Sequence, residues 1–228
     1  MRHASLVLLS GGLDSAHAFV RAHEETDVLF AITFDYGQRA RLQEIASAKK
    51  ICARFDVAHK VIEFPFFRDL TNHPLLNDQK DCPTLTNAQL DSPLHTQKSA
   101  NAVWLPNRNG IFLSLGAAMA EISLADRLYV GFNAEEGATF PDNSHAFVLA
   151  MNKALEFSTQ NQVQVVAPAV KLQKSDIVRE LVEHDFDLSQ IWSCYLGDEK
   201  MCGRCESCLR FKRALMANDR MIEAKNLS

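Results

Sequence analysis

Apolar and polar residues follow two alternating patterns along most of the chain. Short apolar runs that stop at glycine, proline or polar residues are typical of buried strands. Between these runs apolar residues recur at helical spacing, as Leu42, Ile45, Ala48 and Ile51 do. The patterns predict strands at 5–9, 28–34, 57–64, 127–132 and 163–166, and helices at 14–24, 38–55, 111–124, 144–159, 172–184 and 207–217. Strands that alternate with helices favour an α/β fold with a doubly wound parallel sheet.

Residues 65–109 break this alternation. Five of the seven prolines lie in this proline-rich excursion, with Asn, Asp, Gln and Thr between them. A connection of this length inside a compact domain is usually functional or disordered. We expect a partly ordered excursion that covers a site. The helix at 111–124 is apolar almost all round, and we expect it to be buried.

The composition narrows the function classes. Of the 228 residues, 47% are hydrophobic and 23% are charged, which excludes a disordered, collagen-like or coiled-coil chain. The net charge of −4 disfavours a general nucleic-acid binder. No apolar run approaches the roughly 18 residues of a membrane span, and the run at 6–9 is too short for a signal-peptide core. We expect a cytoplasmic protein with no membrane or direct nucleic-acid partner.

Residues 10–15 read SGGLDS and lie where the first strand becomes a helix. Two glycines let the backbone approach a ligand closely, and the helix start offers unpaired N–H groups and a positive dipole end. This phosphate loop (residues 10–15) is neither a Walker loop nor Gly-x-Gly-x-x-Gly. We predict that it binds phosphate or pyrophosphate; a tight turn with a capping serine is the alternative. The candidate nucleotide-binding residues are Ser10, Gly11, Gly12, Leu13, Asp14 and Ser15.

Four of the six cysteines lie close together near the C-terminus, as Cys194-x7-Cys202-x2-Cys205-x2-Cys208. In a reducing compartment this clustering indicates a metal site rather than disulfides. Four thiolates at these spacings match tetrahedral zinc, and a site with no open position is structural. An iron–sulfur cluster is the rival, because Cys-x2-Cys-x2-Cys also opens ferredoxin-type runs.

These features divide the chain into two parts. Residues 1–190 form a nucleotide-binding α/β domain, with the proline-rich excursion near its site. Residues 191–228 form a zinc-binding C-terminal segment with one structural Zn²⁺.

The phosphate loop resembles the PP-loop of the ATP pyrophosphatase superfamily, whose members use ATP to activate a carboxyl or carbonyl oxygen. Together with the cysteine cluster, it makes the chain similar to the QueC family of 7-cyano-7-deazaguanine synthases from about residue 5 to residue 213. The other matching stretches are FDYGQR at 34–39 followed by Glu44, LPNRN at 105–109, FLS at 112–114, GFNAEE at 131–136, PD at 141–142, Lys174 and WSCY at 192–195. Ala40 and Asn107 replace the histidine and the glycine that are usual in the family.

One further departure concerns the substrate. Many bacterial members have Tyr-Pro-Asp-Cys-Arg after the acidic segment, whereas this chain has FPDNSH at 140–145. The arginine is absent, as in the members that resemble the archaeal type. If that arginine contacts a substrate carboxylate elsewhere, another cation does so here, and Arg108 and Lys174 are the candidates.

The resemblance implies an enzyme, an ATP-dependent carbon–nitrogen ligase that converts 7-carboxy-7-deazaguanine and ammonia to 7-cyano-7-deazaguanine. Adenylation would open the carboxylate to ammonia, an amide would form, and a second activation with elimination would give the nitrile. The resemblance also implies ATP with Mg²⁺ as substrate, one structural Zn²⁺, a homodimer and a place in queuosine biosynthesis.

The resemblance assigns catalytic roles to Asp14, Lys174 and Arg108. Asp14 would help to hold Mg²⁺ near the phosphates, and Lys174 or Arg108 would neutralise charge on phosphate or carboxylate. Glu135 or Asp142 would accept protons or bind the guanine-like edge. Each has a structural alternative: a solvated helix start for Lys174, a loop-pinning ion pair for Arg108, a surface acid for Glu135 and a helix cap for Asp142. The candidate substrate-binding residues are Tyr36, Gln38, Arg108, Glu135 and Asp142.

Three other functions remain open on the sequence. A PP-loop ligase or tRNA sulfurtransferase would act on a different carboxyl or carbonyl substrate, and sulfur transfer would need a free reactive cysteine pair. A non-enzymatic zinc module would bind nucleic acid through the Lys and Arg residues around the cysteines, although acidic residues dilute that patch. The same fold would also serve to join a deazapurine acid to another amine.

Overall fold

The computed structural model describes residues 2–70 and 72–225. The described strands are β1 (Ala4–Leu8), β2 (Asp27–Asp35), β3 (Ala58–Glu63), β4 (Arg127–Tyr129) and β5 (Gln164–Val166). They form one parallel sheet in the order β3-β2-β1-β4-β5, which confirms the five predicted strands and the doubly wound fold. The order reverses at β1, and open parallel sheets bind ligands at the carboxyl ends of the strands beside such a reversal.

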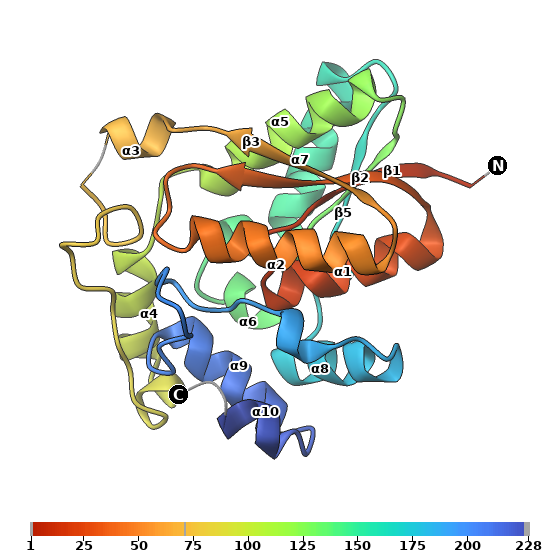
Figure 1. The fold of residues 1–228 in the computed structure, drawn as a ribbon. Coiled ribbons are helices and arrows are strands. Elements are labelled where there is room, and N and C mark those ends of the chain that lie inside the picture. The colour runs from red at the N-terminus through yellow and green to blue at the C-terminus, as the bar shows by residue number, and fades with distance from the viewer. Residues whose placement is uncertain (1, 71, 226–228) are drawn as a thin grey trace.

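Helices cover both faces of the sheet. The longer helices are α1 (Leu13–Glu25), α2 (Arg41–Arg54), α4 (Pro93–Ala102), α5 (Arg108–Ile122), α7 (His145–Ser158), α8 (Lys174–Glu183) and α9 (Glu206–Met216). The short ones are α3 (Phe66–Leu70), α6 (Ala134–Gly137), α10 (Met221–Lys225) and the 3-10 turns η1 (Gln89–Asp91), η2 (Pro141–Asn143) and η3 (Leu188–Gln190). Figure 1 shows α1 and α2 on one face and α5 and α7 on the other.

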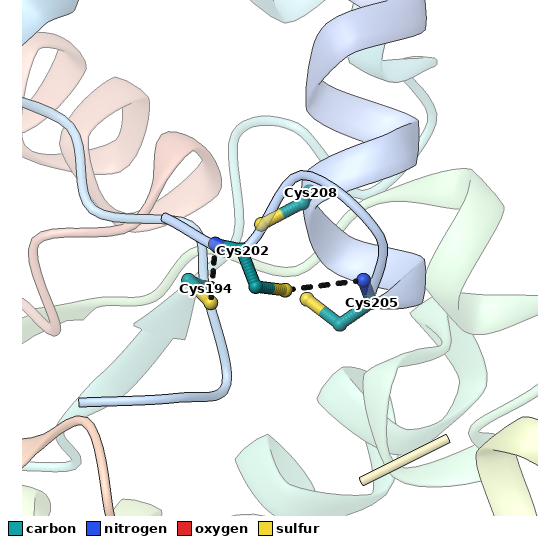
Figure 2. Close-up of side chains that lie close together, drawn as sticks. All are labelled: Cys194, Cys202, Cys205 and Cys208. Atoms are coloured by element: carbon teal, nitrogen blue, oxygen red, sulfur yellow. Dashed lines mark hydrogen bonds between the residues drawn. The ribbon is translucent and has the colours of Figure 1, made fainter. Parts of the chain in front are cut away.

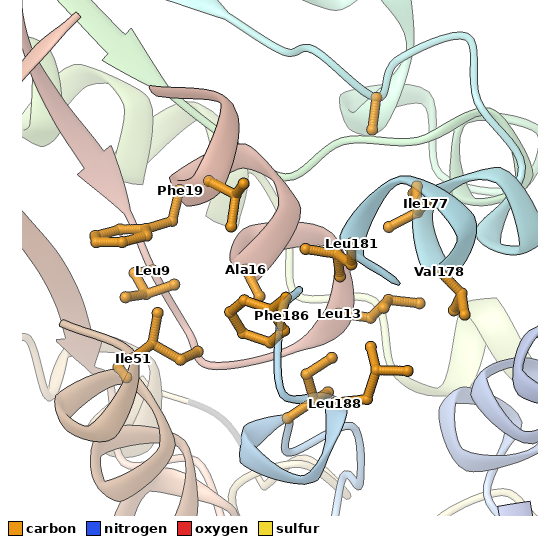
Figure 3. Close-up of a cluster of buried hydrophobic side chains, with 14 of the residues drawn as sticks. Leu9, Leu13, Ala16, Phe19, Ile51, Ile177, Val178, Leu181, Phe186 and Leu188 are labelled. Carbon is orange, nitrogen blue, oxygen red and sulfur yellow. The ribbon is translucent and has the colours of Figure 1, made fainter. Parts of the chain in front are cut away.

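Each face of the sheet has its own hydrophobic core. Along β1, Val7 belongs to the core beneath α1, α2 and α8, whereas Leu6 belongs to the core beneath α5 and α7. The two neighbours separate because successive strand residues point to opposite faces. Phe19 and Ile51, both fully buried, belong to the first core together with Ile177 of α8 (Figure 3). Burying one such side chain stabilises the fold by about 1.5–3 kcal/mol.

The structure corrects several predicted bounds. The helix expected from residue 38 begins at Arg41, because Gly37 adopts a φ of +84° that favours glycine and the chain turns there. The helix expected at 111–124 begins at Arg108, directly after Asn107 in the left-handed region. That helix is not buried all round: the side chain of Ile122 is 82% exposed, because only one side of α5 packs on the sheet. The strand expected to residue 132 ends at Tyr129.

The proline-rich excursion contains α3, η1 and α4, and its residue 71 lies outside the described residues. Thr84 forms an isolated antiparallel bridge with Cys205, and the backbone N–H of Leu85 donates to the carbonyl of Arg204 over 3.1 Å. An ion pair of 2.7 Å joins Asp91 to Arg213. The excursion therefore packs against the cysteine-rich segment. No helix within the described part of the chain combines the length and apolar character of a membrane span.

Candidate active site

The phosphate loop connects β1 to α1 and is held from two sides. The carbonyl of Gly11 accepts hydrogen bonds from the Ser47 hydroxyl and from the Trp192 backbone N–H, both over 2.9 Å. Gly11 has a φ of +79°, and a Cβ there would lie 2.5 Å from the Ser47 Oγ. Gly131, two residues after the end of β4, packs closely on the loop, since a Cβ on it would lie 2.4 Å from the backbone carbon of Asp14. Contacts from three distant segments therefore fix the shape of the loop.

The start of α1 is open for an anion. Gly12 precedes the helix, and no side chain caps its N-terminus. The first N–H groups of a helix have no partner inside the helix and favour negative charge. The Ser15 hydroxyl donates to the carbonyl of Gly12 over 3.0 Å and lies 3.1 Å from the Ser10 hydroxyl. These contacts place two hydroxyl groups beside the open helix start.

A buried lysine lies behind the loop. Lys174 opens α8, and its Nζ donates to Asp14 Oδ2 over 2.6 Å and to Glu136 Oε1 over 2.8 Å. Burial would lower the pKa of Lys174, but the two carboxylates outweigh burial and raise it. Burial raises the pKa of Asp14 to about 6, although Lys174 acts against that rise. One ammonium therefore neutralises only part of the charge of two carboxylates, and Asp14 Oδ1 is buried without a hydrogen-bond partner among the described residues.

A cavity of about 270 Å³ extends from the phosphate loop. Its further wall consists of aromatic rings, among which Phe34 and Phe112 are stacked with their centroids 4.5 Å apart. Arg108, in the first turn of α5, donates from Nη1 to the Tyr36 hydroxyl over 3.1 Å. Of the described residues that line the cavity, Arg108 is the only Lys or Arg. The cavity thus joins the phosphate loop to a part that is lined by aromatic rings and contains the cation of Arg108.

The structure brings most of the candidate residues to this cavity. The candidates that line it are Ser10, Gly12, Leu13, Asp14, Ser15, Tyr36, Gln38 and Arg108. Lys174 and Gly11 lie behind the lining. Glu135 points elsewhere: its Oε2 accepts from Arg210 over 3.0 Å, and its Oε1 accepts from the backbone N–H of Lys174. Asp142 is buried outside the lining.

Other cavity residues were not among the candidates. They are Thr33, Glu44, Asn109, Glu136, Asn143, Trp192, Ser193, Tyr195 and Ser207, together with glycine and apolar wall residues. Glu44, Glu136 and Trp192 lie in the stretches that resemble the QueC family, and this resemblance could have identified them from the sequence. The choice between Glu135 and Glu136 depended on the orientation of α6, which no local pattern gives. No sequence motif pointed to Ser207 as a cavity residue.

The four clustered cysteines converge, as Figure 2 shows. Their Sγ atoms all lie within 4.8 Å of one another. Backbone N–H groups point at two of them: those of Leu196 and Cys202 donate to the Cys194 Sγ, and that of Cys205 donates to the Cys202 Sγ. Such donors stabilise thiolates, so this donor set fits a metal ion. Cys194 also lines the cavity, so the cysteine cluster lies directly beside the candidate active site.

Comparison with known proteins gives consistent matches along the chain. The model of the family "Queuosine biosynthesis protein QueC" matches residues 4–219. A 7-cyano-7-deazaguanine synthase of Methanosarcina barkeri is 45% identical over 213 residues, which cover 92% of each chain. A protein of the same name from Pelotomaculum thermopropionicum is 44% identical over 210 residues, which cover 92% of this chain and 95% of that one. A third, from Carboxydothermus hydrogenoformans, is 45% identical over 214 residues and is covered to 99%.

Solved structures resemble the chain only distantly. The U34-tRNA thiolase NcsA from Methanococcus maripaludis has a TM-score of 0.49 and 17% identity, with 82% of this chain and 58% of that one covered. An NMN synthetase from Francisella tularensis has a TM-score of 0.47 and 15% identity, with coverage of 100% and 88%. Nothing about the chemistry of this chain follows from likenesses of this size. The family match and the relatives span nearly the whole chain, and they establish that it belongs to the QueC family.

Proposed function

We propose that this protein is an ATP-dependent ligase that converts 7-carboxy-7-deazaguanine and ammonia to 7-cyano-7-deazaguanine. The observation that carries the proposal is a single cavity that joins the phosphate loop to a ring-walled part with Arg108. The family supports the reaction, because relatives at 44–45% identity carry the name of this synthase. The lining of the cavity offers the phosphate loop to a nucleotide and aromatic rings to a flat heterocycle.

ATP would bind with its phosphates at the open N-terminus of α1, where N–H groups and the helix dipole favour negative charge. Lys174 would keep its charge there because Asp14 and Glu136 raise its pKa. The unpartnered Asp14 Oδ1 and the carboxylate of Glu136, which lines the cavity, are suitable ligands for Mg²⁺. When bound with ATP, the ion would offset phosphate charge at this end of the cavity.

The chemistry begins with a carboxylate, which resists a nucleophile because its charge repels electron pairs and oxide is a poor leaving group. Transfer of AMP from ATP to the carboxylate oxygen, with release of pyrophosphate, would give an acyl adenylate. Ammonia would then displace AMP and leave an amide. A second activation of the amide oxygen, followed by loss of the activated oxygen and two protons, would give the nitrile. Positioning and charge stabilisation would supply most of the catalysis.

Arg108 is the residue that we assign to the substrate carboxylate. Lys174 is committed to two carboxylates behind the loop, whereas Arg108 lines the cavity. Arg108 would thereby replace the arginine that is absent from 140–145. Tyr36 would form a wall for the flat ring and orient Arg108 through its hydroxyl. For Glu135 and Asp142 we propose supporting roles, because their carboxylates lie outside the cavity lining.

We propose zinc for the cysteine cluster. Tetrahedral zinc with bonds of about 2.3 Å separates neighbouring sulfurs by about 3.8 Å, which agrees with Sγ atoms that lie within 4.8 Å of one another. Bound zinc would link the segment after Ile191 to the start of α9 and would not take part in the reaction. Metal analysis and the visible absorption of the purified protein would distinguish zinc from an iron–sulfur cluster. The homodimer and the cytoplasmic location remain predictions of the sequence.

The test is a mass-spectrometric assay. Zinc-loaded protein is incubated with ATP, Mg²⁺, ammonium and 7-carboxy-7-deazaguanine, beside Asp14→Asn and Glu156→Gln variants. Glu156 is an exposed residue of α7 and serves as the matched control. We expect nitrile from the wild type and from Glu156→Gln, and a loss of at least about 100-fold in Asp14→Asn. Turnover of ATP without nitrile would contradict the proposed substrate and favour another PP-loop ligase.

A further inference from the structure

One carboxylate in the cavity has no role in the proposed reaction. Glu44 lies in the first turn of α2 and lines the cavity. Its Oε2 accepts a hydrogen bond from the Gln38 amide over 2.7 Å. No described residue donates a hydrogen bond to its other oxygen, and no described Lys or Arg forms an ion pair with it. Only one of the two carboxylate oxygens has a hydrogen-bond partner in the described part of the chain, so the group can accept further hydrogen bonds from N–H donors in the cavity.

Gln38 cannot take that role itself, because its amide group is already in use. Its Nε2 donates to the Phe34 carbonyl over 3.1 Å and to Glu44, and its Oε1 accepts from the Tyr36 backbone N–H over 3.0 Å. The side chain of Gln38 is only 3% exposed. Both of its N–H donors are spent inside the protein. Gln38 therefore orients the Glu44 carboxylate rather than binding a ligand.

The surroundings of Glu44 favour a flat heterocycle. The rings of Tyr36 and Phe112 line the same cavity with their centroids 5.5 Å apart, and stacked Phe34 extends this wall. Burial raises the pKa of Glu44, and Gln38 and Arg108 act against that rise. A carboxylate that is shielded from water is stabilised most by charge-assisted hydrogen bonds to a ligand.

We propose that Glu44 is a specificity-determining residue whose carboxylate accepts the two adjacent N–H donors of a 2-amino-4-oxopyrimidine edge, as found in guanine and its 7-deaza analogues. The two donors come from a ring N–H and the neighbouring amino group. This inference rests on the proposed function and names the residue that reads the base. Glu44 takes the role that the sequence assigned to Glu135 or Asp142.

The pattern of hydrogen-bond donors distinguishes the guanine-type edge from the edge of adenine. An ionised carboxylate has acceptors only. The corresponding edge of adenine presents one amino donor beside a ring nitrogen that accepts, so one carboxylate oxygen would face a lone pair. An edge with two adjacent donors satisfies both oxygens. A site built for such donors rejects ligands that lack them much more strongly than an apolar pocket does.

The experiment compares two substrates. The ratio of kcat/KM for 7-carboxy-7-deazaguanine and for its analogue without the 2-amino group is measured in the wild type, Glu44→Gln and Asp35→Asn. Asp35 is the matched acid: it accepts from the Gly37 backbone N–H, lies nine residues earlier and does not line the cavity. We expect the wild type and Asp35→Asn to prefer the amino substrate by about 100-fold. Glu44→Gln should prefer it by less than about 10-fold, with the KM for ATP unchanged.

The substitution keeps an acceptor for the Gln38 amide, so loss of folding is not expected, and the melting temperature checks this. Glu44→Asp serves as a second variant, which keeps both acceptors on a shorter side chain and should give an intermediate ratio. An unchanged ratio in Glu44→Gln would overturn the inference. A raised KM for ATP with an unchanged ratio would assign Glu44 to adenine instead.

A separate measurement makes the inference independent of turnover. Calorimetric titration of 7-deazaguanine, which carries no carboxylate, into wild type and Glu44→Gln reports recognition of the base alone. We expect binding to weaken by about 10-fold or more in Glu44→Gln and to stay unchanged in Asp35→Asn. If the wild type makes no nitrile but this difference holds, the proposed reaction fails and the role of Glu44 stands. Equal binding to both proteins would overturn the role of Glu44 whatever the reaction.

Discussion

The ammonium group of Lys174 lies 2.6 Å from the carboxylate of Asp14, although 160 residues separate them in the chain. The pair joins the start of α8 to the phosphate loop. Glu136 completes it from a third segment, at 2.8 Å from the same Nζ. Because the lysine is buried and both acids are mostly buried, the charges depend on one another more than on water.

Lys174→Met should therefore leave two carboxylates without their cation. We expect the free energy of unfolding to fall by about 3–5 kcal/mol, which is typical when one partner of a buried ion pair is removed. Denaturant unfolding measures this. The double variant Lys174→Met/Glu136→Gln removes one of the stranded charges and should recover part of the loss. A double variant less stable than Lys174→Met would contradict this account of the network.

The segment that follows β4 approaches the phosphate loop closely at Gly131. A Cβ at this position would lie 2.4 Å from the backbone carbonyl carbon of Asp14, so Gly131→Ala should displace the loop. We expect destabilisation of about 1–3 kcal/mol and a large loss of ATP binding. Gly137→Ala is the matched control, since its nearest contact would be an ordinary 3.4 Å. Melting temperature and nucleotide titration measure both, and equal behaviour of the two variants would refute the steric argument.

Metal removal should weaken nucleotide binding as well as stability. Cys194 and Trp192 line the cavity, and the Trp192 backbone N–H holds the carbonyl of Gly11. Chelation should lower the melting temperature and raise the Kd for ATP. By linkage, saturating ATP should in turn tighten metal binding, so that a competing colorimetric chelator removes less metal at equilibrium. A metal-free protein that binds ATP as tightly as the loaded protein would show that the two sites are independent.

His17 should make stability depend on pH. Its side chain is buried, and burial lowers its pKa from the ordinary 6.5, while Glu180 at 2.7 Å acts against that fall. Arg21 and His184 nearby also disfavour its charged form. The unfolded chain therefore binds this proton more readily than the folded chain does.

The stabilisation from neutral His17 is fully present above pH 6.5 and is lost as the pH falls through 6.5 toward the lowered folded pKa. One such group changes the free energy of unfolding by at most about 1.4 kcal/mol per pH unit. Urea unfolding of wild type and His17→Gln between pH 7.5 and 5.5 measures it, and the variant should show the smaller slope. The exposed His145→Gln should keep the wild-type slope. The same slope in all three proteins would contradict this assignment.

Some features of the protein follow from the sequence alone because they are local. The order of strands and helices depends on side-chain periodicity, and the phosphate loop depends on two glycines at a strand end. The spacing of Cys202, Cys205 and Cys208 lets their thiols meet within one short turn and the start of a helix. For such features the backbone of a few residues contains the whole geometric requirement.

Only the tertiary structure decided which side chains share the cavity. Lys174 faces Asp14 because α8 packs against α1, and Glu136 rather than Glu135 faces the cavity because α6 presents one of two adjacent acids to it. Gln38 turns inward to orient Glu44 because its amide satisfies three buried groups. These outcomes depend on long-range packing and on the satisfaction of buried polar groups. Neither is present in the periodicity of a single segment.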